Sequence, residues 1–143
     1  MSKSKLIPSG YEVIEDVPAS KTKKYSFATF LKDSENKITG EEMRKLAKTQ
    51  NANLGIADAE YLLEHQDLIP AEEQSHWLVF PGTLLRYSDG GLFVACLRWD
   101  GGRWVLDFYW VERDFYGYVR LVRSQVSRSL GASPLDTSAR LAK

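Results

Sequence analysis

The apolar residues of this chain change their spacing near His76, and this change constrains the fold more than any other sequence feature. Beyond His76, apolar side chains recur at every second position, which is typical of β-strands. Glycine pairs at 90–91 and 101–102 interrupt the pattern, and glycine readily adopts the positive φ of tight hairpin turns. The C-terminal half therefore predicts antiparallel hairpins. The expected strands are 77–80, 83–87, 92–99, 103–111 and 118–122, with a turn or bulge at Pro81 and Gly82.

Two registers are available to the hairpin at residues 98–104, RWDGGRW. A turn centred on the Asp-Gly pair would set Arg98 opposite Arg103, and like charges directly opposite each other are destabilising. A turn with both glycines at its tip sets Trp99 opposite Trp104 instead. We expect this second register, because it also aligns further apolar pairs: Leu97 with Leu106, Ala95 with Phe108, and Phe93 with Trp110.

The chosen register divides these two strands into two faces. One face is apolar, and we expect it to form the core against the helices; it carries Phe93, Ala95, Leu97, Trp99, Trp104, Leu106, Phe108 and Trp110. The other face is mixed and expected to be half-exposed; it carries Val94, Cys96, Arg98, Val105, Asp107, Tyr109 and Val111. On this mixed face Arg98 lies diagonal to Asp107, within reach of an ion pair.

The middle of the chain has helical spacing. Thr39 and Glu42 fit a capping box, in which each side chain satisfies a backbone N–H of the other residue. Met43, Leu46 and Ala47 then share one helix face. A second helix is expected over 56–66, with Ile56, Ala59, Leu62 and Leu63 turned inward. Pro70 fits the first position of a short third helix.

The spacing is weaker before the first helix, where 11–17 predicts a short strand and 25–31 fits either a strand or a short helix. We therefore expect an α+β fold. Two to three helices from the N-terminal and middle part of the chain would pack on a C-terminal antiparallel β-meander, which could close in part into a small barrel. We expect residues 39–123 to form a single domain, with 1–38 as a partly ordered N-terminal extension and 124–143 as a mobile basic tail.

Composition argues against several classes of protein. A single cysteine, Cys96, rules out an internal disulfide, and no apolar run approaches the roughly 18 residues of a membrane helix. We expect a soluble, cytoplasmic protein that does not contact a membrane. Neither a zinc-binding spacing of Cys and His nor a glycine-rich nucleotide motif occurs, so we expect no metal and no cofactor. Cys96 lies within an expected strand and is interpreted as an inert buried thiol.

Several short motifs resemble those of a group of small, uncharacterised bacterial proteins. The motifs are TGEEM (39–43), NANLG (51–55), AEYLLEHQDLIP (59–70), LVFPGT (78–83), WDGGRW (99–104) and RLVR (120–123). The resemblance covers roughly residues 39–123 and implies that this part is one natural domain. It implies no activity, so no functional residue carries over from it.

We expect a non-enzymatic binding or interaction module that uses the aromatic hairpin surface, with a protein partner preferred over nucleic acid. Tryptophan and arginine are enriched at binding hot spots, and the candidate residues are Arg98, Trp99, Arg103, Trp104 and Tyr109. The first alternative is nucleic-acid binding through sheet aromatics and the tail arginines Arg120, Arg123 and Arg128, since residues 115–143 are basic although the whole chain has no net charge. The second alternative is an enzyme whose site the sequence does not reveal, which a deep pocket holding His76, Asp107 or Glu112 with a strongly shifted pKa would support.

Overall fold

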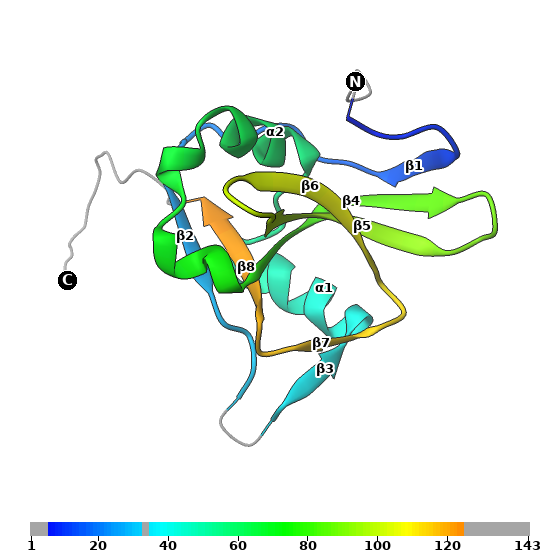
Figure 1. Cartoon of the computed structure of the whole chain (residues 1–143). Coiled ribbons are helices and arrows are strands. Elements are labelled where there is room, and N and C mark those ends of the chain that lie inside the picture. Colours follow the sequence, from blue (N-terminus) through cyan, green and yellow to red (C-terminus); the bar gives the residue numbers. More distant parts are fainter. Residues whose placement is uncertain (1–5, 33–34, 125–143) are drawn as a thin grey trace.

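The computed structural model of the protein describes residues 6–32 and 35–124, and these form an α+β fold around a mixed six-stranded sheet (Figure 1). The main sheet has the strand order β2-β8-β4-β5-β6, and β1 pairs with β4 beside this path. A small second sheet pairs β3 with β7. The strands are β1 Tyr11–Glu15, β2 Tyr25–Ala28, β3 Lys37–Thr39, β4 Trp77–Tyr87, β5 Leu92–Trp99, β6 Trp104–Trp110, β7 Asp114–Tyr116 and β8 Val119–Ser124.

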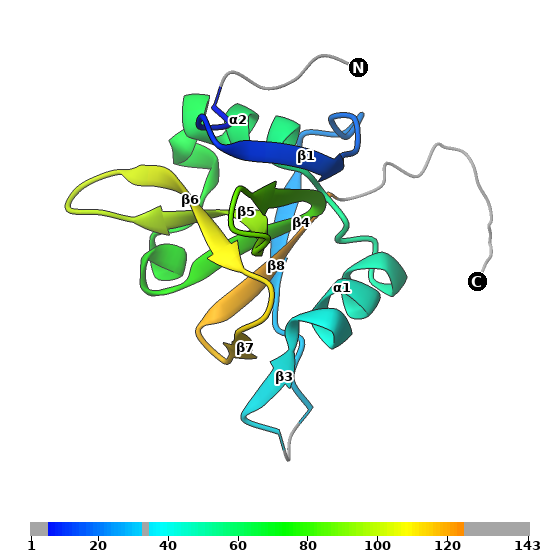
Figure 2. The same cartoon turned by 90° about the vertical axis from the view of Figure 1, so that its right-hand side faces the viewer.

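Two α-helices cover opposite faces of the main sheet (Figures 1 and 2): α1 Gly40–Thr49 and α2 Ile56–Glu64. The expected capping box of α1 is confirmed, because Glu42 N–H donates to Thr39 Oγ1 at 3.1 Å and Thr39 N–H donates to the Glu42 carboxylate at 3.1 Å. The expected short third helix is a 3-10 helix, η2 Ala71–Ser75, with Pro70 directly before it, and another 3-10 helix, η1 Gln66–Leu68, precedes it. No helix in the described part of the chain is long and apolar enough to cross a membrane.

The central strand β4 holds the sheet together because it pairs along both of its edges. On one edge it runs antiparallel to β5. On the other edge its first residues run parallel to β8, and its last residues run antiparallel to β1. The expected turn or bulge at Pro81 and Gly82 is a bulge inside this single strand. Gly82 N–H donates to the carbonyl of Leu54 at 2.7 Å, and a Cβ at residue 82 would lie 2.5 Å from the carbonyl oxygen of Asn53. The bulge therefore lies directly against the segment that leads into α2.

Three expectations about the arrangement of the strands need correction. The sheet is mixed and is not a simple antiparallel meander, because β8 returns beside β4 in parallel orientation after the chain has left the sheet through β7. The described residues form no closed barrel. The segment 1–38, expected to be an extension, supplies β1, β2 and most of β3, and Phe30 and Ile38 belong to the core. The expected mobile tail, apart from Ser124, lies outside the described residues.

The expected register of the β5–β6 hairpin is confirmed in each predicted pair. Asp100 N–H donates to the carbonyl of Arg103 at 2.8 Å, and Gly101 and Gly102 form the tip with φ of 58° and 119°. The two indoles opposite each other, Trp99 and Trp104, meet edge to face with ring centroids 5.7 Å apart. This hairpin is therefore held by its own side chains and turn geometry, as the sequence predicted.

The mixed face, expected to be half-exposed, is buried in part: Val94, Cys96 and Tyr109 are buried, whereas Arg98, Val105, Asp107 and Val111 are half-buried. Leu78, Ala95 and Leu97 pack with α2 on one face. Val94 and Cys96 are fully buried on the other face, in the cluster that contains Met43 of α1. The buried part of this face is covered by α1 and the small sheet, which contribute Met43, Ile38 and Phe115 to the same cluster. Burial raises the pKa of the Cys96 thiol well above its ordinary value, which fits its interpretation as an inert thiol.

Candidate functional site

The residues expected to form a binding surface at the hairpin do not share one exposed face. Trp104 and Tyr109 are only 2% and 5% exposed, and both belong to the core. Trp99 is half-buried against Trp104, and Arg98 Nε donates to the Asp107 carboxylate at 2.8 Å, as expected from their diagonal positions. Only Arg103 is fully exposed. The hairpin tip therefore offers one cation and part of one indole to a partner.

The arginines considered for nucleic-acid binding are also separated. The Arg120 guanidinium donates to the carbonyls of Gly117 and Val119 and to Nε2 of His76, so it holds the turn before β8. Arg123 is exposed farther along the same strand. Arg128 lies outside the described residues. The described residues therefore contain no continuous basic surface built from these side chains.

The residues considered for catalysis lie in different surroundings. His76 Nδ1 contacts the Glu73 carboxylate at 2.9 Å while Arg120 occupies its other ring nitrogen. Asp107 is paired with Arg98, whose pKa is raised mainly by this hydrogen bond. Glu112 is exposed in the turn after β6. In the described part of the chain, no group of three His, Cys, Asp or Glu side chains could hold a metal ion.

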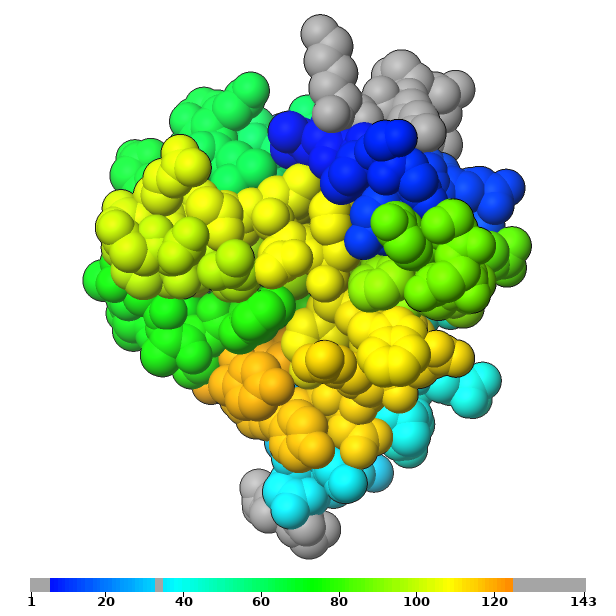
Figure 3. Space-filling view, turned by 45° about the vertical axis from the view of Figure 1, so that its right-hand side comes forward, coloured from blue at the N-terminus to red at the C-terminus, as the bar shows by residue number. Residues whose placement is uncertain are grey.

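An open depression beside β6 gathers aromatic side chains from several strands. We call it the aromatic groove; it has a volume of about 450 Å³ and is lined by Trp77, Phe93, Phe108, Tyr109, Trp110, Arg113 and Tyr118. Trp110 and Tyr118 are 41% and 43% exposed. Tyr116, 40% exposed, stacks on Tyr118 with ring centroids 6.0 Å apart. In Figure 3 the yellow surface of β6 and the orange surface around residues 115–120 lie next to each other on this side of the molecule.

Ring contacts and hydrogen bonds hold several side chains of the aromatic groove in place. Tyr109 packs edge to face on Trp77, and its hydroxyl lies 3.3 Å from that of Tyr118 and donates to the Asp114 carbonyl at 3.2 Å. Burial, and next this contact with Tyr118, raises the pKa of Tyr109. The Arg98 guanidinium lies over the Trp77 ring, 6.0 Å from its centroid. A rigid aromatic wall of this kind loses little conformational entropy when a partner binds.

Two charged side chains lie on either side of Trp110. Arg113 lines the aromatic groove, and no ion pair involves it within the described residues. Glu112 instead lines a neighbouring depression with Asp89, Gly90 and Gly91, which shares Phe93 and Trp110 with the groove. The aromatic groove thus carries one cation that forms no ion pair with any described residue.

Sequence reasoning missed most of the aromatic groove. It placed Trp110 on the core face, because strand alternation assigns Trp110 and Trp104 to the same side. Trp110 is exposed because α2 and η1 cover the Trp104 end of β6, where Gln66 hydrogen-bonds the Trp104 backbone. The signal that could have pointed to this site is Tyr116-Gly117-Tyr118, two large aromatic rings on either side of a turn residue.

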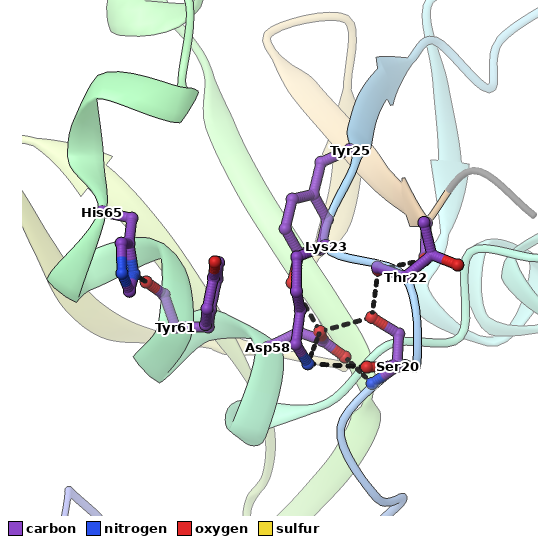
Figure 4. A network of polar contacts seen from close by, with 8 residues as sticks. Ser20, Thr22, Lys23, Tyr25, Asp58, Tyr61 and His65 are labelled. Atoms are coloured by element: carbon purple, nitrogen blue, oxygen red, sulfur yellow. Dashed lines mark hydrogen bonds and ion pairs between the residues drawn. The ribbon is translucent and has the colours of Figure 1, made fainter. Parts of the chain in front are cut away.

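A polar cluster around Asp58 is the other concentration of functional groups (Figure 4). The Asp58 carboxylate is fully buried in the first turn of α2 and accepts hydrogen bonds from Ser20 N–H, Ser20 Oγ and Tyr25 Oη at 3.0, 2.7 and 2.7 Å. Lys23 Nζ lies 3.8 Å from the same carboxylate and donates to the Ser20 carbonyl. Burial, and next the bond to Asp58, raises the pKa of Tyr25. Because both carboxylate oxygens are engaged by the chain itself, we assign this cluster to fastening residues 20–25 onto α2.

A second polar contact fastens the N-terminal segment, here at Asp16, to the β4 bulge. Thr83 Oγ1 accepts the backbone N–H of Ile56 at 2.7 Å, which satisfies a free donor at the start of α2. The Thr83 hydroxyl in turn donates to Asp16 at 2.6 Å. The carboxylates of Asp16 and Asp58 thus bind the N-terminal segment to the helix start by two separate routes.

No protein-family model, no curated protein and no solved structure matches the chain. The resemblance of residues 39–123 to small bacterial proteins stays a prediction.

Proposed function

We propose that the protein is a non-enzymatic binding module, and that its aromatic groove receives apolar side chains of a protein partner. The observation that carries the proposal is the exposure of Trp110 and Tyr118 at 41% and 43% around a common depression. Large aromatic residues gathered at one exposed place are typical of interaction sites, because isolated exposed rings are the commoner arrangement elsewhere on a surface.

The shape and charge of the aromatic groove favour a protein over a polyanion. The groove carries one cation, Arg113, that forms no ion pair among the described residues, whereas Arg98 is paired with Asp107 and Arg120 binds the turn before β8. Nucleic-acid binding depends on several cations that neutralise successive phosphates. A protein side chain buried among Trp77, Trp110 and Tyr118 needs no such row of charges, and burial of its apolar surface would drive binding.

Selection from a displayed library of random dodecapeptides on the immobilised protein tests this proposal. Selected peptides are synthesised, and their affinities are measured for the unaltered protein and for Trp110→Ala, Tyr118→Ala and Leu68→Ala. Leu68 is the matched control, because it is 41% exposed on η1 and lies outside the aromatic groove.

We expect Trp110→Ala and Tyr118→Ala each to weaken binding about tenfold or more, as hot-spot truncations do. Leu68→Ala should leave affinity unchanged. Peptides that bind all four proteins equally, or a library that yields no binder, would contradict the proposal. Circular dichroism and an unchanged unfolding midpoint establish that the exposed-residue variants remain folded.

A further inference from the structure

The strand that borders the aromatic groove is an open edge of the sheet. Among the residues that the structure describes, β6 pairs only with β5, and at seven residues it is longer than the edge strands β1 and β2, which have five and four. Two hydrogen bonds show which backbone groups face β5: Asp100 N–H donates to the Arg103 carbonyl, and Val111 N–H donates to the Leu92 carbonyl. Between Arg103 and Val111, every second residue therefore directs its N–H and carbonyl toward β5. By alternation, the backbone groups of Trp104, Leu106, Phe108 and Trp110 point away from β5, toward the free side.

Part of this free side is satisfied by side chains. The Gln66 amide binds Trp104 twice, accepting from its N–H at 2.8 Å and donating to its carbonyl at 3.1 Å. The Asp107 carboxylate accepts the N–H of Phe108 at 2.8 Å, and the carbonyl of Trp110 accepts the N–H of Arg113 at 3.1 Å. Within the described residues, the N–H and carbonyl of Leu106, the carbonyl of Phe108 and the N–H of Trp110 have no such partner.

These open groups lie beside the aromatic groove. Phe108 and Trp110 project from one face of β6 and Tyr109 from the other, and all three line the same depression. A depression lined from both faces of a strand extends around that strand, and because β5 occupies one edge of β6, this depression extends around its free edge or its C-terminal end. Main-chain donors and acceptors at strand spacing, next to pockets for side chains, are what an added strand requires.

Building on the proposed function, we propose that its partner binds as an extended peptide that adds a strand to β6. Alternate peptide residues would hydrogen-bond Leu106, Phe108 and Trp110. Apolar peptide side chains would enter the aromatic groove, and an acidic side chain would pair with Arg113. Arg113 supplies the charge complementarity, since it lines the groove and no carboxylate of the described residues forms an ion pair with it.

A second copy of this chain fits the edge less well than a separate peptide. The two-fold antiparallel register that uses the open carbonyl of Phe108 and the open N–H of Leu106 in both copies centres on Asp107. It sets the two Asp107 carboxylates directly opposite each other, and like charges in that position are destabilising. A two-fold register centred on Leu106 would instead require the backbone of Trp104, which Gln66 already occupies. A register centred on Tyr109 would require the N–H of Phe108 and the carbonyl of Trp110, which Asp107 and the Arg113 N–H already engage.

The test uses a peptide selected on the unaltered protein, together with analogues methylated at one backbone nitrogen each. Methylation removes an N–H donor without changing any side chain. We expect affinity to fall about tenfold or more at alternate residues of the peptide and to change about twofold or less at the residues between them, since only alternate N–H groups face β6. Analogues that all bind like the parent peptide would overturn the added strand, and dependence on Trp110 would still support the proposed function. Loss of the Trp110 dependence would contradict the proposed function itself.

Substitutions in the protein provide the complementary test. Leu106→Pro removes an N–H that points away from β5, so the β5–β6 ladder is retained, and Leu106→Ala controls for the side chain. We expect the proline variant alone to weaken binding about tenfold. If Leu106→Pro does not fold, the methylation series decides.

Arg113→Gln should weaken only peptides that carry an acidic residue, and equal weakening of their Glu→Gln analogues would reject the ion pair. A protein that sediments as a dimer, and that Leu106→Pro converts to a monomer, would identify a second copy as the occupant and overturn the proposal.

Discussion

The buried carboxylate of Asp58 provides the most demanding test of how the N-terminal segment is held. Asp58→Ala would leave Ser20 N–H and the Tyr25 hydroxyl without acceptors, whereas Ser20 Oγ would keep the Thr22 carbonyl, to which it also donates at 2.9 Å. Each donor stranded in this way costs about 1–3 kcal/mol. Lys23 contributes little to this sum, because its side chain is 33% exposed and 3.8 Å away. We expect Asp58→Ala to lower the free energy of unfolding by about 3–5 kcal/mol, as removal of one member of a buried polar group does.

Guanidinium chloride unfolding, followed by tryptophan fluorescence and by circular dichroism, measures this loss. The midpoint should fall while the slope remains constant, because the surface exposed on unfolding is unchanged. Glu64→Ala is the matched control: Glu64 is an exposed carboxylate on the same helix, and its loss should change stability by no more than about 0.5 kcal/mol. A loss below about 1 kcal/mol for Asp58→Ala would contradict this role of Asp58. The three donors would then gain no more from the carboxylate than they gain from hydrogen bonds to water.

Three further outcomes are expected. Leu97→Ala, at a fully buried position, should cost about 2–5 kcal/mol in chemical unfolding, and half-buried Leu106→Ala should cost clearly less; the reverse order would contradict the assignment of the core. A double-mutant cycle on Trp99 and Trp104 should give a coupling energy of about 0.5–1.5 kcal/mol, and a value near zero would mean that their edge-to-face contact does not stabilise the hairpin. Burial, and next its carboxylate partner, raises the pKa of Tyr25 above the ordinary 10.0. Its contribution to stability is therefore complete below pH 10.0 and is lost as the pH rises toward the folded value. The loss of unfolding free energy at alkaline pH should be shallower for Tyr25→Phe, and identical curves would reject this coupling.

Local signals accounted for what the sequence predicted well. The capping box at Thr39 and the Gly101-Gly102 turn depend on residues a few positions apart, so their geometry could be inferred from spacing and from the preferences of single residues. The pairing of Trp99 with Trp104 followed from that turn, since a two-residue tip fixes every later pair in the hairpin.

Long-range pairing accounted for most of what the sequence did not predict. Nothing in the apolar alternation of β8 indicates that it lies parallel to β4, or that β1 continues the same edge beyond the bulge. The mixed face was expected to be half-exposed because it carries Tyr109 and charges, and Val94 and Cys96 on the same face were the indication that a helix covers part of it. An all-apolar stretch such as 93–97 is typical of a strand buried on both faces.

The candidate site could not be predicted for a related reason. Alternation assigns a residue to a face of a strand, but it does not say how far along the strand that face is covered. Trp104 and Trp110 share a face of β6, and they are 2% and 41% exposed because the helix covers only one end. The exposure of Tyr118 likewise depends on where the chain passes from β7 in the small sheet to β8 in the main sheet.

The four tryptophans provide the most direct test of the account, because they separate the aromatic groove from the hairpin tip. Each indole N–H gives its own signal in a two-dimensional ¹H–¹⁵N spectrum, and single Trp→Phe substitutions assign the signals. When a selected peptide is added, the account predicts shifts of the Trp77 and Trp110 signals, with Trp99 and Trp104 unchanged. Shifts confined to Trp99 and Trp104 would place the binding surface at RWDGGRW instead and would contradict the aromatic groove as the site.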